Sequence, residues 1–500
     1  MRQVLGLQIA VRALAVVLLG LAVLGAAGLS AGPGLAQTAD EVITKQYEDG
    51  SVYTGTFRNG LQNGTGSYRL TNGYEYSGDW VDGEIKGTGR ARYPNGSIYE
   101  GAFVKGQPDG RGKITYADGG TYEGDWAAGK ITGTGRAAYA NGSVYEGGFV
   151  DGKHQGQGSV TDASGYRYVG SWVAGQKDGA GKITYGDGAV YDGTLVMGER
   201  SGKGTLTMPD GLTYIGDWKA GQINGVGRLT QPNGDVYDGP FVEGLRAGIG
   251  KIAYANGDSY AGGFQADKRV GEGVFIAKDG TRYTGAWVGG RMQGAGAMRY
   301  ADGSVYVGSF AADQPDGAGK IDYADGGFYE GQWAAGAMTG RGKIGYANGS
   351  VYDGALVNGR PQGIGVMSYG DGYRYEGAWV DGVRMGVGTA IWADGTVYKG
   401  NFKDGLRSGK GELVQPDGFK YVGDWVAGAI EGVGEASYAT GDVYQGAFVA
   451  GKREGAGTLT YKGGEVSQGV WKSGILTAPF PTPAPAPAAA DAETAVPVTP

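Results

Sequence analysis

Cysteine is absent from this chain of 500 residues, and histidine occurs only once, at His154. Without cysteine there is no disulfide framework, no thiol nucleophile and no thiolate ligand for a metal ion. One histidine without any cysteine also argues against a zinc site and against Ser-His or Cys-His catalysis. His154 falls in the segment 152–156, which we interpret as a solvent-exposed loop. We therefore expect no metal, no cofactor and no catalytic residue.

A nucleotide-binding loop is missing too, because neither Gly-Lys-Ser nor Gly-Lys-Thr occurs. The chain also lacks a block of positive charge. Its 44 Lys and Arg residues are scattered among 51 Asp and Glu residues, and its formal net charge is −7. Nucleic acids and anionic lipids attract basic surfaces. The charge distribution therefore argues against nucleic acid as a partner, and the lack of catalytic motifs predicts a protein that is not an enzyme.

Glycine and tyrosine are abundant instead, with 106 and 34 residues. The pattern Tyr-x-Gly-x-Phe/Trp recurs every 23 residues, without insertion or deletion, from Tyr53 to Tyr444, and a degenerate copy begins at Ser467. When the tyrosine is given offset 0, glycine occupies offsets 2, 11, 13 and 20 in every complete copy. A fixed short period is typical of a stacked repeat architecture rather than of a globular enzyme.

Alternation within the repeat indicates β-strands. Offsets 0, 2 and 4 alternate with polar positions, as do offsets 13, 15 and 17, which is the period of a strand. Between these strands, Asn-Gly or Asp-Gly recurs at offsets 19 and 20, as in Asn72-Gly73, and predicts a type I′ turn with positive φ at both residues. One hairpin is too small to fold alone, so neighbouring hairpins must stack. We predict an all-β fold, an elongated, solenoid-like, single-layer array of about 19 stacked hairpins over residues 43–476.

The aromatic residues of the repeat have two possible roles. They can form the core of the array, or they can form an exposed platform for sugars or extended peptides. We favour the core, because nothing else in the repeat can supply one. The glycine at offset 2 is then expected to leave room for a neighbouring ring or backbone. The glycines at offsets 11 and 13 are expected to meet positive-φ or close-approach needs.

The first residues carry the features of an export signal. Arg2 and Arg12 accompany a long apolar run, and small residues lead up to Ala36. Residues 1–36 are therefore predicted to be a signal peptide that is cleaved between Ala36 and Gln37. The alternative is an uncleaved segment that anchors the chain in the inner membrane. Both interpretations put the array outside the cytoplasm, in the periplasm or secreted.

The remaining segments complete the domain organisation. Residues 37–42 are a short lead, and residues 477–500 are predicted to be a Pro/Ala-rich disordered tail. Within the array, the sequence Gln-Pro-Asp-Gly that begins at Gln107 returns 207 residues later at Gln314. A block of nine repeats therefore appears twice, which we interpret as a duplication.

The repeat resembles a known family. The unit from Tyr122 to Gly142, with its Tyr-Glu-Gly-Asp-Trp start, its Gly-Thr-Gly and its closing Asn-Gly turn, is similar to the MORN (membrane occupation and recognition nexus) repeat. The resemblance covers residues 43–471 and implies a β-hairpin array without catalysis of its own. Relatives carry such arrays on phosphatidylinositol phosphate kinases and a histone methyltransferase, or as the body of junction-forming and cytoskeletal scaffolds. Phospholipid binding is often proposed for the family.

Carboxylates recur at offsets 1 and 3, as in Glu100 and Asp125. A pair of carboxylates could act as general acid and base on a glycan. Because offsets 1 and 3 point away from the aromatic side, we interpret these residues as a solvated outer face.

Together these features predict a non-enzymatic scaffold or protein-binding protein of the bacterial envelope. Its partner would be another envelope protein or a second copy of the chain. The alternative is a binder of cell-wall glycan or membrane lipid through the aromatic groove. The residue before the tyrosine is usually apolar in Phe units and polar in Trp units, which stacking does not require. The candidate binding residues are Val144, Val190, Val236, Val305, Trp80, Trp126, Trp172 and Trp218. Added β-propensity is the other explanation for these valines.

Overall fold

The structure, a computed structural model, describes residues 41–480. The predicted signal peptide (residues 1–36) and most of the predicted tail (residues 481–500) lie outside the described residues. Within residues 41–480, no helix has the length and apolar character that a membrane crossing requires.

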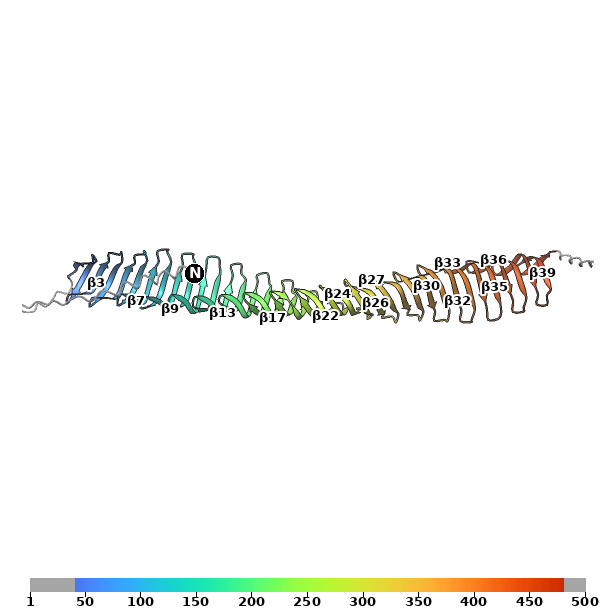
Figure 1. Ribbon diagram of the computed structural model, residues 1–500, viewed down its shortest axis with the longest axis horizontal. Helices are drawn as coiled ribbons and strands as arrows, with labels where there is room; N and C mark the ends of the chain where they lie inside the picture. Colours follow the sequence, from blue (N-terminus) through green and yellow to red (C-terminus); the bar gives the residue numbers. More distant parts are fainter. Residues whose placement is uncertain (1–40, 481–500) are drawn as a thin grey trace, which may run out of the picture. The chain divides into compact units, whose positions relative to one another are not determined.

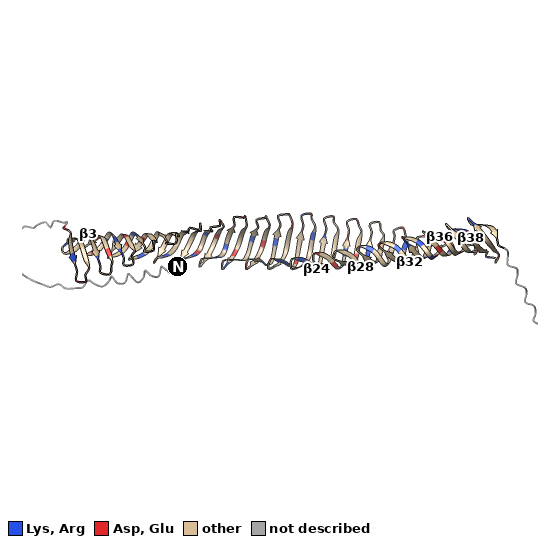
Figure 2. Ribbon diagram, turned by 90° about the horizontal axis from the view of Figure 1, so that it is seen from above, with Lys and Arg blue, Asp and Glu red and all other residues tan. Residues whose placement is uncertain are grey.

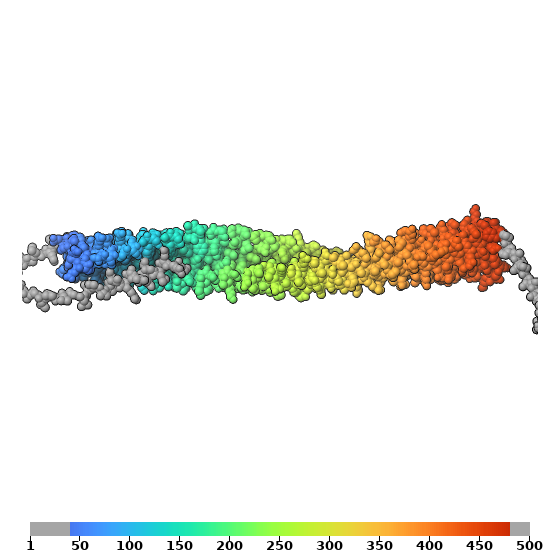
Figure 3. All heavy atoms as spheres, turned by 45° about the horizontal axis from the view of Figure 1, so that its top comes forward, coloured from blue at the N-terminus to red at the C-terminus, as the bar shows by residue number. Residues whose placement is uncertain are grey.

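The chain divides into two compact units, Met1–Ala255 with Phe264–Asp267 and Asn256–Gly263 with Lys268–Pro500. In each unit, antiparallel strands follow one another in sequence order (Figure 1). Figure 3 shows the same order on the surface, where successive segments of each unit form neighbouring bands. Within each unit the described strands are joined into an antiparallel sheet. The all-β class and the hairpin repeat are thereby confirmed.

The first unit contains the strands β1 (Ile43–Gln46), β2 (Val52–Arg58), β3 (Leu61–Arg69), β4 (Glu75–Val81), β5 (Glu84–Arg92), β6 (Ile98–Val104), β7 (Gln107–Thr115), β8 (Thr121–Ala127), β9 (Lys130–Ala138), β10 (Val144–Val150), β11 (Lys153–Thr161), β12 (Arg167–Val173), β13 (Gln176–Thr184), β14 (Val190–Val196), β15 (Glu199–Thr207), β16 (Thr213–Lys219), β17 (Gln222–Thr230), β18 (Val236–Val242), β19 (Leu245–Arg246) and β20 (Gly248–Ala253). Strand β21 (Ser259–Gln265) has residues in both units.

The second unit contains the strands β22 (Lys268–Ile276), β23 (Arg282–Val288), β24 (Arg291–Arg299), β25 (Val305–Ala311), β26 (Gln314–Asp322), β27 (Phe328–Ala334), β28 (Ala337–Gly345), β29 (Val351–Val357), β30 (Arg360–Ser368), β31 (Arg374–Val380), β32 (Val383–Ile391), β33 (Val397–Lys403), β34 (Leu406–Val414), β35 (Lys420–Val426), β36 (Ala429–Ser437), β37 (Val443–Val449), β38 (Lys452–Thr460), β39 (Val466–Lys472) and β40 (Ile475–Pro479). Strand β40 ends at Pro479, a little beyond the array end that the sequence placed at residue 476.

Each repeat supplies two strands, and the glycines line up across them. In the repeat that begins at Tyr76, β4 spans offsets −1 to 5 and β5 spans offsets 8 to 16. Gly78 of β4 lies opposite Gly89 of β5 on one side and opposite Gly66 of β3 on the other. The same pairing of offset 2 with offset 13 recurs in most strand pairs, so these glycines form a row of backbone without side chains across the strands.

The turns differ from the prediction in type. At offsets 19 and 20 the turn is present, but only the glycine has positive φ, as in Gly73 at 90°. The N–H of Gly73 bonds to the carbonyl three residues earlier at 3.1 Å, and Asn72 Oδ1 accepts the N–H of Tyr74 at 3.0 Å. This is a type I turn followed by a left-handed glycine, not the predicted type I′ turn. The residue before the glycine keeps a φ that is not positive, also where it is Ser164 or Thr440.

Type I′ geometry occurs instead at offsets 6 and 7, where no turn was predicted. Asp82 and Gly83 have φ values of 48° and 83°. The signal is weak in sequence because offset 6 is often alanine, as at Ala128, which nevertheless has a φ of 48°. The tight two-residue connection matches the right-handed twist of the strands that it joins.

The tyrosine lies over the glycine row of its own repeat. A Cβ on Gly89 would lie 2.4 Å from Cε2 of Tyr76, and a Cβ on Gly78 would lie 2.4 Å from Cα of Gly89. Tyr76 Oη donates to the carbonyl of Asp79 at 3.0 Å. The glycine at offset 2 was predicted to leave space for a neighbouring ring or backbone. That space is occupied by the tyrosine of the same repeat and by the backbone of the paired strand. At offset 11, Gly87 has a φ of 118°, which confirms the predicted need for positive φ there.

The core of each unit is built from edge-to-face rings, with Leu195 and Leu356 in place of the offset 4 ring in two repeats. Tyr99 contacts Phe103 of its own repeat at a centroid distance of 5.0 Å and Trp126 of the next repeat at 5.1 Å, with interplanar angles of 89° and 79°. All three rings are buried. Edge-to-face contacts are favourable for aromatic rings, and each tyrosine joins two repeats. The interpretation of these rings as core is confirmed.

Candidate binding surfaces

The sheet has two faces with different chemistry. Side chains alternate along a strand, so offsets 0, 4, 9 and 15 share one face, which we call the aromatic face. Offsets −1, 1, 3, 5, 12 and 14 share the other, which we call the outer face. In the repeat that begins at Tyr375, the aromatic face holds the buried Tyr375, Trp379 and Ala390, whereas the outer face holds the exposed Val380 and Val387.

The aromatic face is closed by the side chains at offset 9. Arg407 lies with Cζ 4.1 Å from the ring centroid of Trp425, and its Nη2 donates to the carbonyl of Gly428 at 2.7 Å. This cation–π contact is favourable, and the hydrogen bond ties one repeat to the turn of the next. In the described part of the chain, the arginines that stack on tryptophan rings are Arg200, Arg269, Arg407 and Arg453.

The four predicted tryptophans belong to this closed face. Trp80, Trp126, Trp172 and Trp218 are only 4–5% exposed. Each Nε1 donates to a glycine carbonyl of the preceding repeat at 3.2–3.3 Å. Their rings are therefore part of the core, and a ligand reaching them would have to displace the offset 9 side chains.

His154 is one of these covering side chains rather than a loop residue, which corrects the sequence interpretation. It lies in β11 at offset 9, with its ring stacked on Tyr145 at a centroid distance of 3.6 Å. Its Nε2 is 2.7 Å from Tyr139 Oη. Burial lowers the pKa of His154 to about 4, so the imidazole is neutral at pH 7. The residue fills the place that Arg or Ile takes in other repeats.

The outer face carries charges of alternating sign. Arg90 Nε lies 3.2 Å from Glu100 Oε1, and the same pair recurs between Arg136 and Glu146 at 3.0 Å. Carboxylates at offset 1 are two strands apart, and a Lys or Arg at offset 14 often lies between them, as Lys113 does. Figure 2 shows both signs mixed along each unit. The arrangement suits a solvated face stabilised by cross-strand pairs better than a general acid and base.

The aspartates at offset 3 have a local structural role. Asp125 Oδ2 accepts the N–H of Thr134 at 2.7 Å, across the β-bulge between β8 and β9. This hydrogen bond, with the nearby Arg111, holds the pKa of Asp125 below its usual range. Within residues 41–480, no cluster of three or more Asp, Glu, His or Cys side chains could hold a metal ion.

The four predicted valines lie on the outer face, opposite the tryptophans, so the structure does not bring the two sets together. All four are half-buried: Val144, Val190, Val236 and Val305. Val144, for example, lies between Ala138 and Thr161 on the adjacent strands. Their role in docking remains a prediction.

A more exposed apolar row was missed at offset 5, the last position before the type I′ turn. Valine occupies this offset in many repeats, and its exposure ranges from 40% at Val81 to 62% at Val288. The sequence signal was available, because offset 5 continues the alternation of offsets 1 and 3. The motif Tyr-x-Gly-x-Phe/Trp covers offsets 0 to 4, so the valines at offset 5 lie just outside it.

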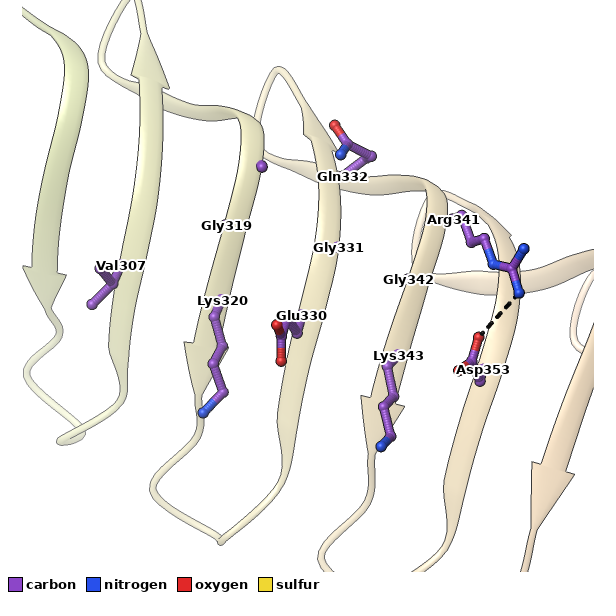
Figure 4. A pocket seen from close by; sticks show the side chains of 11 residues that line it. Val307, Gly319, Lys320, Glu330, Gly331, Gln332, Arg341, Gly342, Lys343 and Asp353 are labelled. Carbon is purple, nitrogen blue, oxygen red and sulfur yellow. Dashed lines mark ion pairs between the residues drawn. The ribbon is translucent and has the colours of Figure 1, made fainter.

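Shallow open depressions occur on the outer face. In the second unit one is lined by Lys320, Glu330 and Lys343 from three consecutive strands, and by the ion pair of Arg341 with Asp353 at 3.8 Å (Figure 4). The glycine row forms its floor. A second depression, in the first unit, is lined by Asp192, Lys203, Thr205, Ile215 and Val226. In neither depression do several reactive side chains point toward one position.

Comparison with known proteins gives one family. The family model described as MORN repeat matches eighteen segments, from residues 53–73 to residues 444–466. No curated protein matches the chain. Solved structures that match include the TCP domain of Drosophila melanogaster SAS-4 in complex with a proline-rich motif of Ana2, at 17% identity, covering 42% of this chain and 96% of that one, with a TM-score of 0.17. The TCP10 domain of Danio rerio CPAP matches at 16% identity, covering 52% and 96%, with a TM-score of 0.16. These TM-scores are too low to carry an argument.

Proposed function

Because the chain belongs to the MORN repeat family, we propose that it is a non-enzymatic scaffold that binds other proteins in a bacterial envelope. The observation that carries the proposal is the difference between the two faces. The rings of the aromatic face are buried in contacts between repeats. The outer face is exposed to solvent, and its polar and apolar side chains recur from repeat to repeat. Such a surface can present the same contacts many times. The envelope location rests on the predicted signal peptide at residues 1–36.

A second candidate function is binding of a cell-wall glycan. The rings of the core are buried, but tyrosines at offset 17 are partly exposed to solvent. Tyr139, Tyr346 and Tyr461 are each 38% exposed. Partly exposed rings at regular spacing can stack on sugars. This observation favours glycan over membrane lipid, which would need a basic face.

A sedimentation assay with insoluble peptidoglycan separates the two functions. The scaffold proposal predicts that the purified protein stays in the supernatant, with no saturable retention. A variant with Tyr139→Ala, Tyr346→Ala and Tyr461→Ala serves as the control, because it removes the open rings and leaves the core. Saturable retention that this variant loses would establish glycan binding and contradict the scaffold proposal.

A further inference from the structure

The duplicated blocks provide an internal comparison of the outer face. Residues 145–184 in the first unit and residues 352–391 in the second occupy the same repeat positions, 207 residues apart. Four outer positions that are polar or small in the first block are aliphatic in the second. The pairs are Gln157 and Ile364, Ser159 and Val366, Gln176 and Val383, and Ala180 and Val387. Within every pair the two side chains are either both exposed or both half-buried.

In the second block these residues form one patch. Val383 lies directly opposite Val380 on the neighbouring strand, and Ile364 of β30 lies opposite a small residue, Ala378 of β31. We define the aliphatic patch as Val357, Ile364, Val366, Val380, Val383 and Val387, from β29 to β32. Its most exposed members are Val387 at 70% and Ile364 at 68%.

Folding does not require this patch. The first block has the same strand register and the same exposure, yet it carries Gln157 and Gln176 where the patch has Ile364 and Val383. Isolated exposed aliphatic residues are ordinary, but a contiguous cluster marks a contact surface. The difference between the blocks therefore points to a function of strands β29 to β32 that residues 145–184 do not share.

Two carboxylates flank the patch on the row that offsets 1 and 14 form across the strands. Elsewhere on this row a cation separates two carboxylates, as Lys343 does between Glu330 and Asp353. In the patch the corresponding position is Val366, which lies between Asp353 and Glu376. Each of these two carboxylates keeps a single ion pair, to Arg341 and Arg374 respectively. The net charge of the chain is also negative, at −7.

The size of the patch argues against a second copy as the occupant. Four strands and about five residues along each give an area on the order of 300 Å². A stable pair of proteins buries about 800 Å² on each partner. The patch instead fits a short extended segment of another protein.

We propose that the aliphatic patch binds an extended partner segment that carries aliphatic side chains and Lys or Arg residues. This inference rests on the proposed scaffold function and adds the place and the chemistry of contact. The aliphatic side chains of the partner segment pack on Ile364 and Val387, and its Lys or Arg side chains form ion pairs with Asp353 and Glu376.

The test is selection from a phage-displayed library of random peptides on the purified protein. The wild type is expected to enrich peptides that combine aliphatic residues with Lys or Arg. A swap variant with Ile364→Gln, Val366→Ser, Val383→Gln and Val387→Ala is expected to bind these peptides at least about tenfold more weakly. The swap is compatible with folding, because the first block already carries these residues in the same register.

A reciprocal variant is the matched control. Gln157→Ile, Ser159→Val, Gln176→Val and Ala180→Val are expected to create a second, weaker site for the selected peptides. Enrichment of acidic peptides, or equal binding by the swap variant, would overturn the inference. So would self-association of the wild type that the swap variant loses in sedimentation velocity. After any of these three results, continued binding of envelope proteins elsewhere on the array would leave the proposed function standing.

Discussion

Replacing Gly216 by alanine is expected to unfold the repeat that begins at Tyr214. An added Cβ would lie 2.4 Å from Tyr214 Oη and 2.5 Å from Cα of Gly227. The backbone of Gly227 cannot move without breaking the pairing of β16 with β17. Overpacking costs about 1–3 kcal/mol where side chains can adjust, and we expect a cost above that range here. Hydrogen–deuterium exchange should show lost protection across β15 to β18.

The matched control is Gly463→Ala. Its Cβ would meet no atom within 4 Å, and its φ is not positive. This variant should keep wild-type exchange throughout. Wild-type protection around β16 in Gly216→Ala would show that the glycine row is not a steric requirement of the fold.

Alkaline pH is expected to unfold the array in a steep transition. Burial raises the pKa of the core tyrosines, and for Tyr214, Tyr283 and Tyr398 the value is about 12. In the unfolded chain the tyrosine pKa is about 10. The raised pKa contributes stability that is fully present below about pH 10 and is lost as pH rises toward 12, because the unfolded chain releases protons that the native state retains. Each such proton contributes a slope of about 1.4 kcal/mol per pH unit.

Because the same tyrosine recurs in each repeat, these slopes add along the array. Tyrosinate absorbance and circular dichroism should therefore change together, at a pH above that at which the chain in denaturant titrates. Ionisation of most tyrosines near pH 10 with the β-sheet signal intact would contradict the buried-ring account.

The sequence predicted the strands and the core well because both depend on local alternation. Tyr76, Gly78 and Trp80 alternate with polar residues, so their shared face follows from strand geometry alone. The turn types were not predictable in the same way. At Asn72-Gly73 only the glycine has positive φ, although the dipeptide favours positive φ at both residues, and Ala128 has positive φ although alanine disfavours it.

The surfaces were harder to predict than the core. His154 seemed a loop residue because offset 9 varies between repeats, yet the structure shows that quite different side chains cover the same rings there. The exposed valines of offset 5 lay outside the recognisable motif. The aliphatic patch is visible in the sequence only after the strand register separates outer positions such as Ile364 from core positions such as Met367.

A photo-crosslinking amino acid at position 364 tests the central claim, that this array is a protein-binding scaffold, most directly. The experiment would be done in intact cells that make the protein, with position 157 as the matched site in the first block. The account predicts a covalent adduct with another polypeptide at position 364 and little or none at position 157. No polypeptide adduct at either position, or adducts with glycan alone, would contradict the scaffold account, whereas equal polypeptide adducts at both positions would contradict only the role of the aliphatic patch.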